Sequence, residues 1–235
     1  MVVNSDSFQA ASISGTGTVT AQNIYINGGY IGGSKFVGAV TSPSPAVADP
    51  VAPLPSLDPN SLTLQSSVPI NLTGDATLLP GLYVGGVTFS GGTLILQPGV
   101  YFFQGGGLSI TATTLTATGV LIYNAPGNSP FFGQPINILV TGTLAVSPTT
   151  TGPYQGISIW QDDNITSAVI LTFNGTNASL TGTVYVPGAS VRINGSQNLN
   201  GAQIISRRLR ILSSGSLIVD PTAQRRNTRR IQLVE

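Results

Sequence analysis

Short runs of alternating apolar and polar residues, separated by glycine-containing corners, recur along most of this chain. Runs at 171–173, 191–193, 209–211 and 229–231 begin 20, 18 and 20 residues apart, and Pro-Gly-Leu-Tyr at 80–83 returns as Pro-Gly-Val-Tyr at 98–101. The runs are rich in β-branched and aromatic residues, as half-buried strands are. Glycine supplies the positive φ that tight corners need. No stretch has helical periodicity, so we expect very little helix.

A repeat of this kind predicts an all-β fold. With three short strands in about 18–20 residues, it favours a right-handed parallel β-helix (β-solenoid), in which each strand pairs with its equivalent one coil later. An antiparallel sandwich is the competing interpretation, because its strands also recur every 8–12 residues. The sandwich, however, predicts no match of side-chain type one coil apart, and such matches are present here.

Proline placement divides the chain. Six prolines between positions 43 and 59 exclude a central strand, so residues 43–61 are expected to be a Pro-rich excursion. Residues 1–42 are then a strand-rich segment that packs on the solenoid, residues 62–220 are the β-helix, and residues 221–235 are a basic C-terminal cap or tail. Pro-rich loops at 124–135 and 147–155 should project from the stack.

Composition excludes several kinds of chemistry. The 235 residues include no histidine and no cysteine, and only 7% are charged. Ser-His-Asp and Cys-His nucleophiles, Cys/His zinc sites, haem and iron–sulfur ligation and disulfides are therefore absent. No apolar run approaches the roughly 18 residues of a membrane span, and no signal-peptide pattern opens the chain. We expect no enzymatic activity and no cofactor.

Asp162 and Asp163 are the only adjacent carboxylates. Paired carboxylates hydrolyse glycosidic bonds in some β-helix enzymes, but neighbours on a strand point to opposite faces, so a solvated turn is the preferred interpretation. Two weaker alternatives remain: a calcium site at Asp162 and Asp163, and a glycan contact at Trp160 and Asp162.

Charge is distributed very unevenly. Residues 1–190 carry a net charge of −5, whereas residues 191–235 carry +6 and hold every arginine. Arg192 and Arg210 share one phase of the repeat and should point outward on adjacent coils. The cluster is interpreted as a cap that blocks edge-to-edge addition, as a contact for an anionic ligand such as acidic polysaccharide, or as a subunit contact. Its members are Arg192, Arg207, Arg208, Arg210, Arg225, Arg226, Arg229 and Arg230. Nucleic acid is not expected, because no aromatic residues interleave with the arginines.

Thr-x-Thr runs occur at 16–20, 111–118, 141–143 and 181–183. Flat threonine ladders on β-solenoids bind ice, so an ice-binding solenoid is one alternative. The runs do not recur at one constant phase of the repeat, and we interpret them mainly as β-propensity on solvent-facing sides.

Several motifs together resemble a known family. They are Asn-Ser-x-Ser, Ser-Ile-Ser-Gly-Thr-Gly-Thr-Val-Thr-Ala, Gly-Gly-Tyr, Val-Ala-Asp-Pro-Val-Ala-Pro-Leu-Pro, the paired Pro-Gly-Leu-Tyr and Pro-Gly-Val-Tyr, Gly-Ile-Ser-Ile-Trp-Gln-Asp and Ile-Gln-Leu-Val-Glu. The chain resembles the extracellular β-rich part of bacterial tight-adherence (Tad) pilus-assembly-associated proteins, the TadE/TadG-like group of planctomycete-like bacteria. This resemblance implies a cell-envelope role without catalysis. It also implies a hydrophobic N-terminal anchor helix, which this sequence lacks.

The leading hypothesis is therefore a non-enzymatic, extracellular structural protein of the bacterial cell surface, associated with pilus or envelope assembly or adhesion. A carbohydrate-binding or carbohydrate-processing β-helix and an ice-binding solenoid are the alternatives. Expected partners are other copies of the chain, pilus or envelope components, or an anionic polysaccharide at the arginine-rich end. Contact with a membrane is expected only through an anchor outside this sequence.

Overall fold

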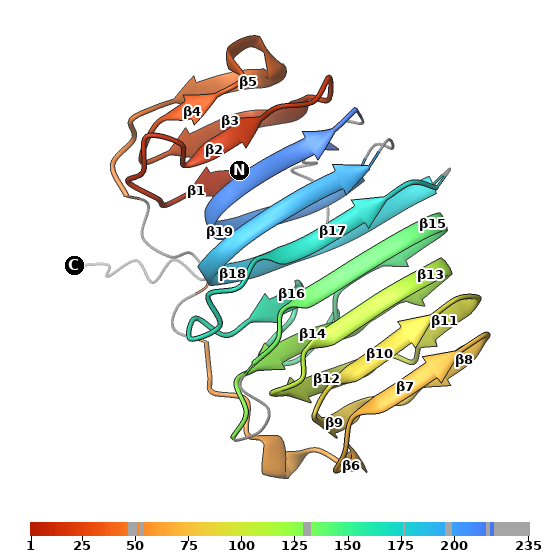
Figure 1. Ribbon diagram of the computed structural model, residues 1–235. Helices are drawn as coiled ribbons and strands as arrows, with labels where there is room; N and C mark the ends of the chain where they lie inside the picture. Colours follow the sequence, from red (N-terminus) through yellow and green to blue (C-terminus); the bar gives the residue numbers. More distant parts are fainter. Residues whose placement is uncertain are drawn as a thin grey trace.

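The strands of this protein stack on one another in layers (Figure 1). The computed structural model describes residues 1–46, 51, 54–128, 133–175, 177–195, 199–214 and 217–218. Over these residues the only helical elements are two 3-10 turns, η1 (Gly33–Lys35) and η2 (Pro59–Ser61). The strand pairings found there are all parallel, so the all-β, parallel prediction is confirmed and the antiparallel sandwich is wrong. No helix in the described part of the chain is long and apolar enough to cross a lipid bilayer.

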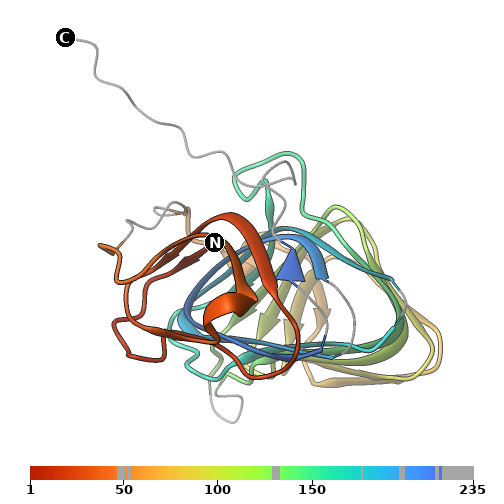
Figure 2. The same cartoon turned by 90° about the horizontal axis from the view of Figure 1, so that it is seen from above.

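Three ladders of parallel strands form the sides of the stack, and we call one strand from each ladder a layer. Figure 2, a view down the stack, shows the layers as loops that overlie one another. We call the bottom of the stack in Figure 1 its lower end and the top its upper end. From the lower end to the upper end, the members of ladder A are β7 (Ile70–Thr73), β10 (Val87–Ser90), the first part of β13 (Leu108–Ala117), the first part of β15 (Ile136–Val146), β17 (Val169–Phe173), the last parts of β18 (Asn177–Gly195) and β19 (Leu199–Ser213), β2 (Ala11–Ile13) and β4 (Tyr30–Ile31).

Ladder B follows ladder A around each layer. Its members are β8 (Ala76–Leu78), β11 (Thr93–Leu96), the second parts of β13 and β15, the first parts of β18 and β19, β20 (Leu217–Ile218), and the first parts of β3 (Val19–Ile26) and β5 (Phe36–Thr41).

Ladder C closes each layer. Its members are β6 (Leu64–Ser66), β9 (Gly81–Val84), β12 (Gly99–Gln104), β14 (Val120–Ala125), β16 (Ile157–Gln161), the middle parts of β18 and β19, β1 (Val2–Val3), and the second parts of β3 and β5.

The core is one continuous column of inward side chains, because successive residues of a strand point to opposite faces. On ladder A one inward position is apolar and buried in layer after layer: Val87, Leu108, Ile136, Val169, Val191, Leu209 and Ala11. Burying each of the larger of these side chains stabilises the fold by about 1.5–3 kcal/mol relative to its exposure. The alternation seen in the sequence thus produces a largely apolar interior.

Glycine at the corner between ladders C and A lets adjacent layers approach closely. Gly86 and Gly107 have φ of 78° and 71°. A Cβ on Gly86 would lie 2.4 Å from the carbonyl oxygen of Gly107, and one on Gly107 would lie 2.5 Å from that of Pro135. Only glycine fits such a corner without moving the backbone.

The N-terminal segment continues the stack above the C-terminal strands. β1 and β2 stack on β19, while β20 occupies ladder B between β19 and β3. One layer is therefore built from β1, β2 and β20, which come from opposite ends of the sequence. Figure 1 shows this junction as red strands directly above blue ones.

The segment after β5 connects the upper end of the stack to its lower end. Its described residues lie along the outer face of ladder C, where Val51 is buried and Leu54 and Leu57 are partly buried. We call residues 43–61 the strap. The proline-rich composition predicts an excursion, and the structure adds that this excursion packs on the stack.

Candidate functional site

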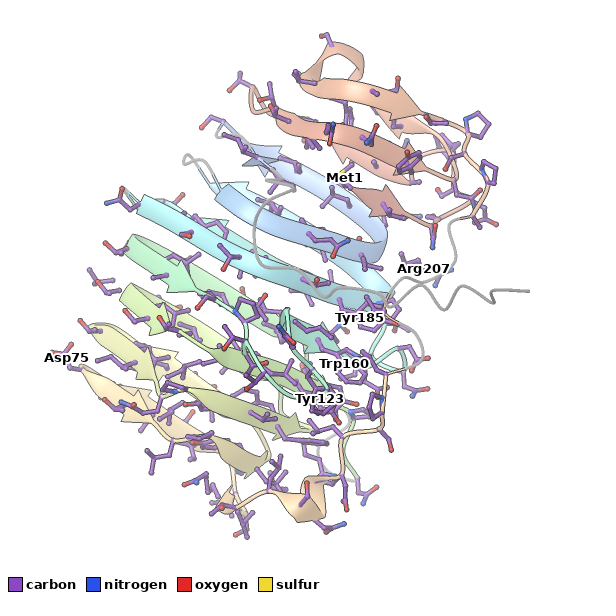
Figure 3. All side chains as sticks on the ribbon, turned by 180° about the vertical axis from the view of Figure 1, so that it is seen from behind. Met1, Asp75, Tyr123, Trp160, Tyr185 and Arg207 are labelled. Carbon is purple, nitrogen blue, oxygen red and sulfur yellow. The ribbon has the colours of Figure 1, made fainter. Side chains whose placement is uncertain are left out.

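The outer face of ladder C carries a row of large side chains, one from each of several layers. Phe102, Tyr123, Trp160 and Tyr185 occupy equivalent positions on β12, β14, β16 and β18. The ring centroids of consecutive members are 4.9, 4.5 and 6.0 Å apart. Figure 3 shows Tyr123, Trp160 and Tyr185 one above another on the same side of the stack. We call these four residues the aromatic row.

The strap and a loop cover this row. Val51 of the strap and Tyr154 of the loop between β15 and β16 belong to the same buried cluster as Tyr123 and Tyr185. The hydroxyl of Tyr154 donates to the carbonyl oxygens of Pro55 and Ser56, at 3.3 Å from each. Its ring lies 6.0 Å from that of Trp160. Trp160, a glycan contact in the sequence-based hypothesis, is thus partly buried among three tyrosines.

Asp162 and Asp163 follow β16 in a turn, which is the geometry preferred for them from the sequence. One carboxylate oxygen of Asp162 accepts from the backbone N–H and side-chain amide of Asn164, at 3.0 and 2.8 Å. The other accepts from the hydroxyl of Tyr123 at 2.9 Å. Asp163 is exposed and accepts from the Asn164 side chain at 3.2 Å. Asp162 and Trp160 are therefore linked through Tyr123.

The surroundings of Asp162 and Tyr123 shift the pKa values of both groups. Burial alone would raise the pKa of the Asp162 carboxyl, but hydrogen bonds from Asn164 and Tyr123 outweigh it and lower that pKa below its ordinary value. Burial, together with the hydrogen bond to Asp162, raises the pKa of the Tyr123 hydroxyl. Asp162 is thus held as an ionised acceptor, which is the wrong state for a general acid.

Two buried amides lie on the inner side of ladder C beside the turn. Asn124 and Gln161 pair in register on β14 and β16, and the Asn124 amide donates to Gln161 Oε1 at 3.1 Å. The Gln161 amide donates to the carbonyl oxygens of Ile165 and Ser167, at 3.2 and 2.8 Å. Asn124 also donates to the carbonyl of Gln134 at 2.8 Å. This amide pair ties two loops to the core.

Tyr123, Tyr154 and the amide pair were not predicted from the sequence. Alignment of Ile122-Tyr123-Asn124 with Ile159-Trp160-Gln161 would have found three of these residues, because that is the observed register. The interval of 37 positions from Tyr123 to Trp160 includes the loop between β14 and β15, which hides the repeat. Nothing in the sequence points to Tyr154.

The arginines lie above this region. The described ones are on β18 and β19, and β1, β2 and β20 stack on β19, so the interpretation of these arginines as a cap at the end of the stack is wrong. Arg192 and Arg210 are register partners on β18 and β19, as their shared phase predicts. Neighbouring strands are about 4.8 Å apart, and neither guanidinium has an ion pair within the described residues. Arg192 Nε is buried without a hydrogen-bond partner there. Arg207 and Arg208 are exposed at the corner between ladders C and A, and Arg208 donates to the Ser7 hydroxyl at 3.3 Å. Figure 3 shows Arg207 higher on the stack than Tyr185. The remaining arginines, at 225, 226, 229 and 230, lie outside the described residues.

Ladder B has an outward threonine row. Two of its members, Thr114 and Thr143, belong to Thr-x-Thr runs identified in the sequence, but their alignment in register was not predicted. Thr93, Thr114 and Thr143 are register partners, and Asn177 follows them. The interval of 29 residues between Thr114 and Thr143 exceeds one repeat, because it contains the loop between β14 and β15. A search for threonines one repeat apart therefore does not align Thr114 with Thr143.

Metal ligands do not gather around the turn. Among the described residues, no three acidic side chains lie close enough to hold a metal ion together. The side-chain contacts of Asp162 and Asp163 are with Asn164 and Tyr123, and neither of these residues is acidic. Both carboxylates accept hydrogen bonds from Asn164 and so stabilise the turn.

Comparison with known proteins identifies no relative: no family model, no curated protein and no solved structure matches this chain.

Proposed function

We propose that this chain is a right-handed parallel β-helix that serves as a non-enzymatic structural component of the bacterial cell surface, in pilus or envelope assembly or in adhesion. One observation supports this role above all others. The apolar core is continuous from layer to layer, and the strap and the Tyr154 loop seal the aromatic row on ladder C. Such a stack is a stiff rod with largely uncharged sides, which suits a spacer or scaffold.

The location can be tested by immunogold electron microscopy of the producing bacterium, with antibodies raised against the purified protein. We expect label at the envelope or on surface filaments. Label confined to the cytoplasm would overturn the proposal. A crystal structure with left-handed winding would overturn its architectural part.

The absence of catalysis can be tested separately with a panel of neutral and acidic polysaccharides. The chain has no histidine or cysteine, and Asp162 is committed to hydrogen bonds that keep it ionised. We expect no release of reducing sugar. Turnover that Asp162→Asn abolishes would replace the structural proposal with a carbohydrate-processing one.

An anionic polysaccharide is the partner that the arginines favour. Arg192 and Arg210 are register partners that form no ion pair with a described residue, and like charges at this spacing repel. A polymer carrying carboxylates or sulfates would relieve that repulsion. We expect binding to a polyuronate that weakens with salt, and no binding to dextran.

A matched pair of variants tests whether this row is responsible. Arg192→Gln with Arg210→Gln should weaken polyuronate binding by about tenfold or more, equivalent to about 1.4 kcal/mol. Arg192→Lys with Arg210→Lys keeps both charges and should retain most of the affinity. Equal affinity of the glutamine variant and the wild type would exclude the row as the site.

Ice binding is a second candidate because of the threonine row on ladder B. Thr93, Thr114 and Thr143 form a regular line along a parallel sheet, with strands spaced about 4.8 Å apart. A thermal-hysteresis assay tests this directly. Activity that Thr114→Tyr abolishes and that Thr88→Tyr on ladder A leaves intact would establish it; no hysteresis in the wild type would remove it.

A further inference from the structure

Both ends of the stack leave the core incompletely covered. Apart from Met1, the partly buried apolar residues that pack against the main core lie in the end layers: Ile70, Leu72 and Ala76 in the lowest layer and Tyr30 and Val40 in the uppermost. Beside the lower end, Val68 and Leu79 are 61% and 55% exposed. Covering this apolar surface at the two ends would therefore stabilise the molecule further.

Each ladder also ends in an edge strand. Within the described part of the chain, β6, β7 and β8 pair only with the layer above them, and β4 and β5 pair only with the layer below them. The free N–H and C=O groups of such edges are templates for another strand. Because the pairings are parallel throughout, the upper end of one molecule presents strands in the same direction and order as the lower end of another requires.

The molecule already contains a contact of this kind. β1 and β2 stack on β19 although roughly 200 residues separate them in the sequence, so this layer-to-layer contact does not depend on a continuous chain. An end-on second copy would repeat the same contact, with β4 against β7 on ladder A and β5 against β8 and β6 on ladders B and C.

Charge at the two ends is complementary. Lys35, the only lysine in the chain, lies in η1 between β4 and β5, at the upper corner between ladders A and B. Asp75 lies between β7 and β8, at the same corner of the lower end, and Figure 3 shows it at the edge of the lower part of the stack. Asp75 is exposed, and one of its carboxylate oxygens accepts from the Thr93 N–H at 2.7 Å. Lys35 donates to the carbonyl oxygen of Gly15, so both side chains are bonded to the adjacent layer of their own molecule, and a contact between copies would use the remaining ammonium hydrogens and the second carboxylate oxygen. Asp58 in η2 adds a second negative charge near the lower end.

We propose that the upper end of one molecule docks on the lower end of a second copy, so that the three ladders continue from copy to copy and Lys35 meets Asp75. This contact is head to tail and leaves a free edge at each end of the pair, so it builds rods longer than a dimer. The proposal deepens the structural role proposed above. Its test measures assembly alone, so its failure would leave the surface location untouched.

The test is a pair of charge reversals examined by sedimentation velocity. Lys35→Glu places a carboxylate opposite Asp75, and Asp75→Lys places an ammonium group opposite Lys35, so each variant alone should assemble at least about tenfold more weakly than the wild type. In an equal mixture, the unchanged Asp75 of the Lys35→Glu variant can meet the unchanged Lys35 of the Asp75→Lys variant, as in the wild type. The two substituted ends also carry opposite charges and can meet each other. We expect the mixture to recover much of the assembly of the wild type.

Controls separate this contact from other causes. Asp163→Lys changes the net charge as Asp75→Lys does, but on the side of the stack, and should assemble like the wild type. If Asp75→Lys does not fold, Asp75→Asn keeps an acceptor for Thr93 and should weaken assembly without abolishing it.

Four results would overturn the proposal. They are a wild type that stays monomeric at its solubility limit, reversed variants that assemble normally, a mixture that stays monomeric, and electron micrographs of wild-type assemblies that show rods joined side by side.

Discussion

At the scale of single residues, Tyr123 and Asp162 join the aromatic row to the turn that follows β16. The phenol donates to a carboxylate that also accepts from Asn164, so the ionised form of Asp162 is stabilised in the folded protein. The folded pKa of Asp162 is therefore lower than the unfolded one. The stability that results is present above the unfolded pKa and is lost as pH falls through the folded pKa.

Asp162→Asn should accordingly destabilise the protein at pH 7 by about 1–2 kcal/mol, because a charge-assisted hydrogen bond at a partly exposed site is weakened. The difference from the wild type should shrink as pH falls from about 5 to 2. Urea unfolding midpoints at a series of pH values measure this. Asp163→Asn, at the exposed neighbour, should change stability by less than about 0.5 kcal/mol at pH 7. A difference for Asp162→Asn that stays constant down to pH 2 would contradict the assignment.

Gln161 illustrates why a polar residue can occupy the core. Its side chain is fully buried, yet it donates to two loop carbonyls and accepts from Asn124 and from the Ile136 N–H. Gln161→Leu keeps the approximate volume but leaves these groups without partners, and each buried unsatisfied group costs about 1–3 kcal/mol. We expect a loss of roughly 2–5 kcal/mol in urea denaturation. Gln22→Leu, at an exposed position, is the control and should change little. A loss below about 1 kcal/mol for Gln161→Leu would mean that water replaces the amide.

At the scale of elements, the strap is held by side chains that its proline-rich composition does not reveal. Val51 is 3% exposed against the outer face of ladder C. Val51→Ser should weaken this contact by about 1–3 kcal/mol, through lost apolar burial and a buried hydroxyl. Because Trp160 is the only tryptophan and lies in the row beneath, its fluorescence should shift to longer wavelength. Proteolysis within residues 43–61 should also become faster.

Ser56→Ala is the control for the strap, because it changes an exposed side chain and keeps the backbone carbonyl that accepts from Tyr154. Its fluorescence and proteolysis should match those of the wild type. An unchanged Trp160 spectrum in Val51→Ser would show that the strap does not shield the row.

The elements also show where sequence reasoning succeeds and where it stops. The pairing of Arg192 with Arg210 was predictable, because one layer of stacking is here one repeat of the sequence. The other matched runs among the described residues do lie in consecutive layers, but the predicted register is wrong by two residues: Leu171 pairs with Ile193, and Tyr83 with Phe103. Thr114 and Thr143 escaped detection because a loop between them adds residues without adding a layer. In the aromatic row, the step from Tyr123 to Trp160 escaped detection for the same reason. Sequence spacing predicts the register only where consecutive layers contain the same number of residues.

At the scale of the whole molecule, the position of the N-terminal segment was beyond any spacing argument. That residues 1–42 pack on the solenoid is an expectation from the sequence, but their site above β19 depends on the pairing of Val2 with Ile205. A pairing made once, across most of the chain, leaves no periodic signal. Covering the core at β19 is favourable, but the sequence does not indicate which segment covers it.

The contact between β1, β2 and β19 leads to a final prediction, about how a local loss of stability spreads to neighbouring layers. Val3 is fully buried and pairs with Ser206 of β19 and Ile26 of β3. Val3→Ala should cost about 1–3 kcal/mol by leaving a cavity. In hydrogen exchange followed by mass spectrometry, amides of β19 should then exchange faster although they lie about 200 residues away, while those of β10 and β12 should not change. Val87→Ala is the matched control: it should speed exchange in β7 and β13, its register neighbours, and leave β1 and β19 unaffected. If Val3→Ala loosens β1 and β3 but leaves β19 as slow as in the wild type, the N-terminal layers are an appendage, and the stack is sealed at β19 without them.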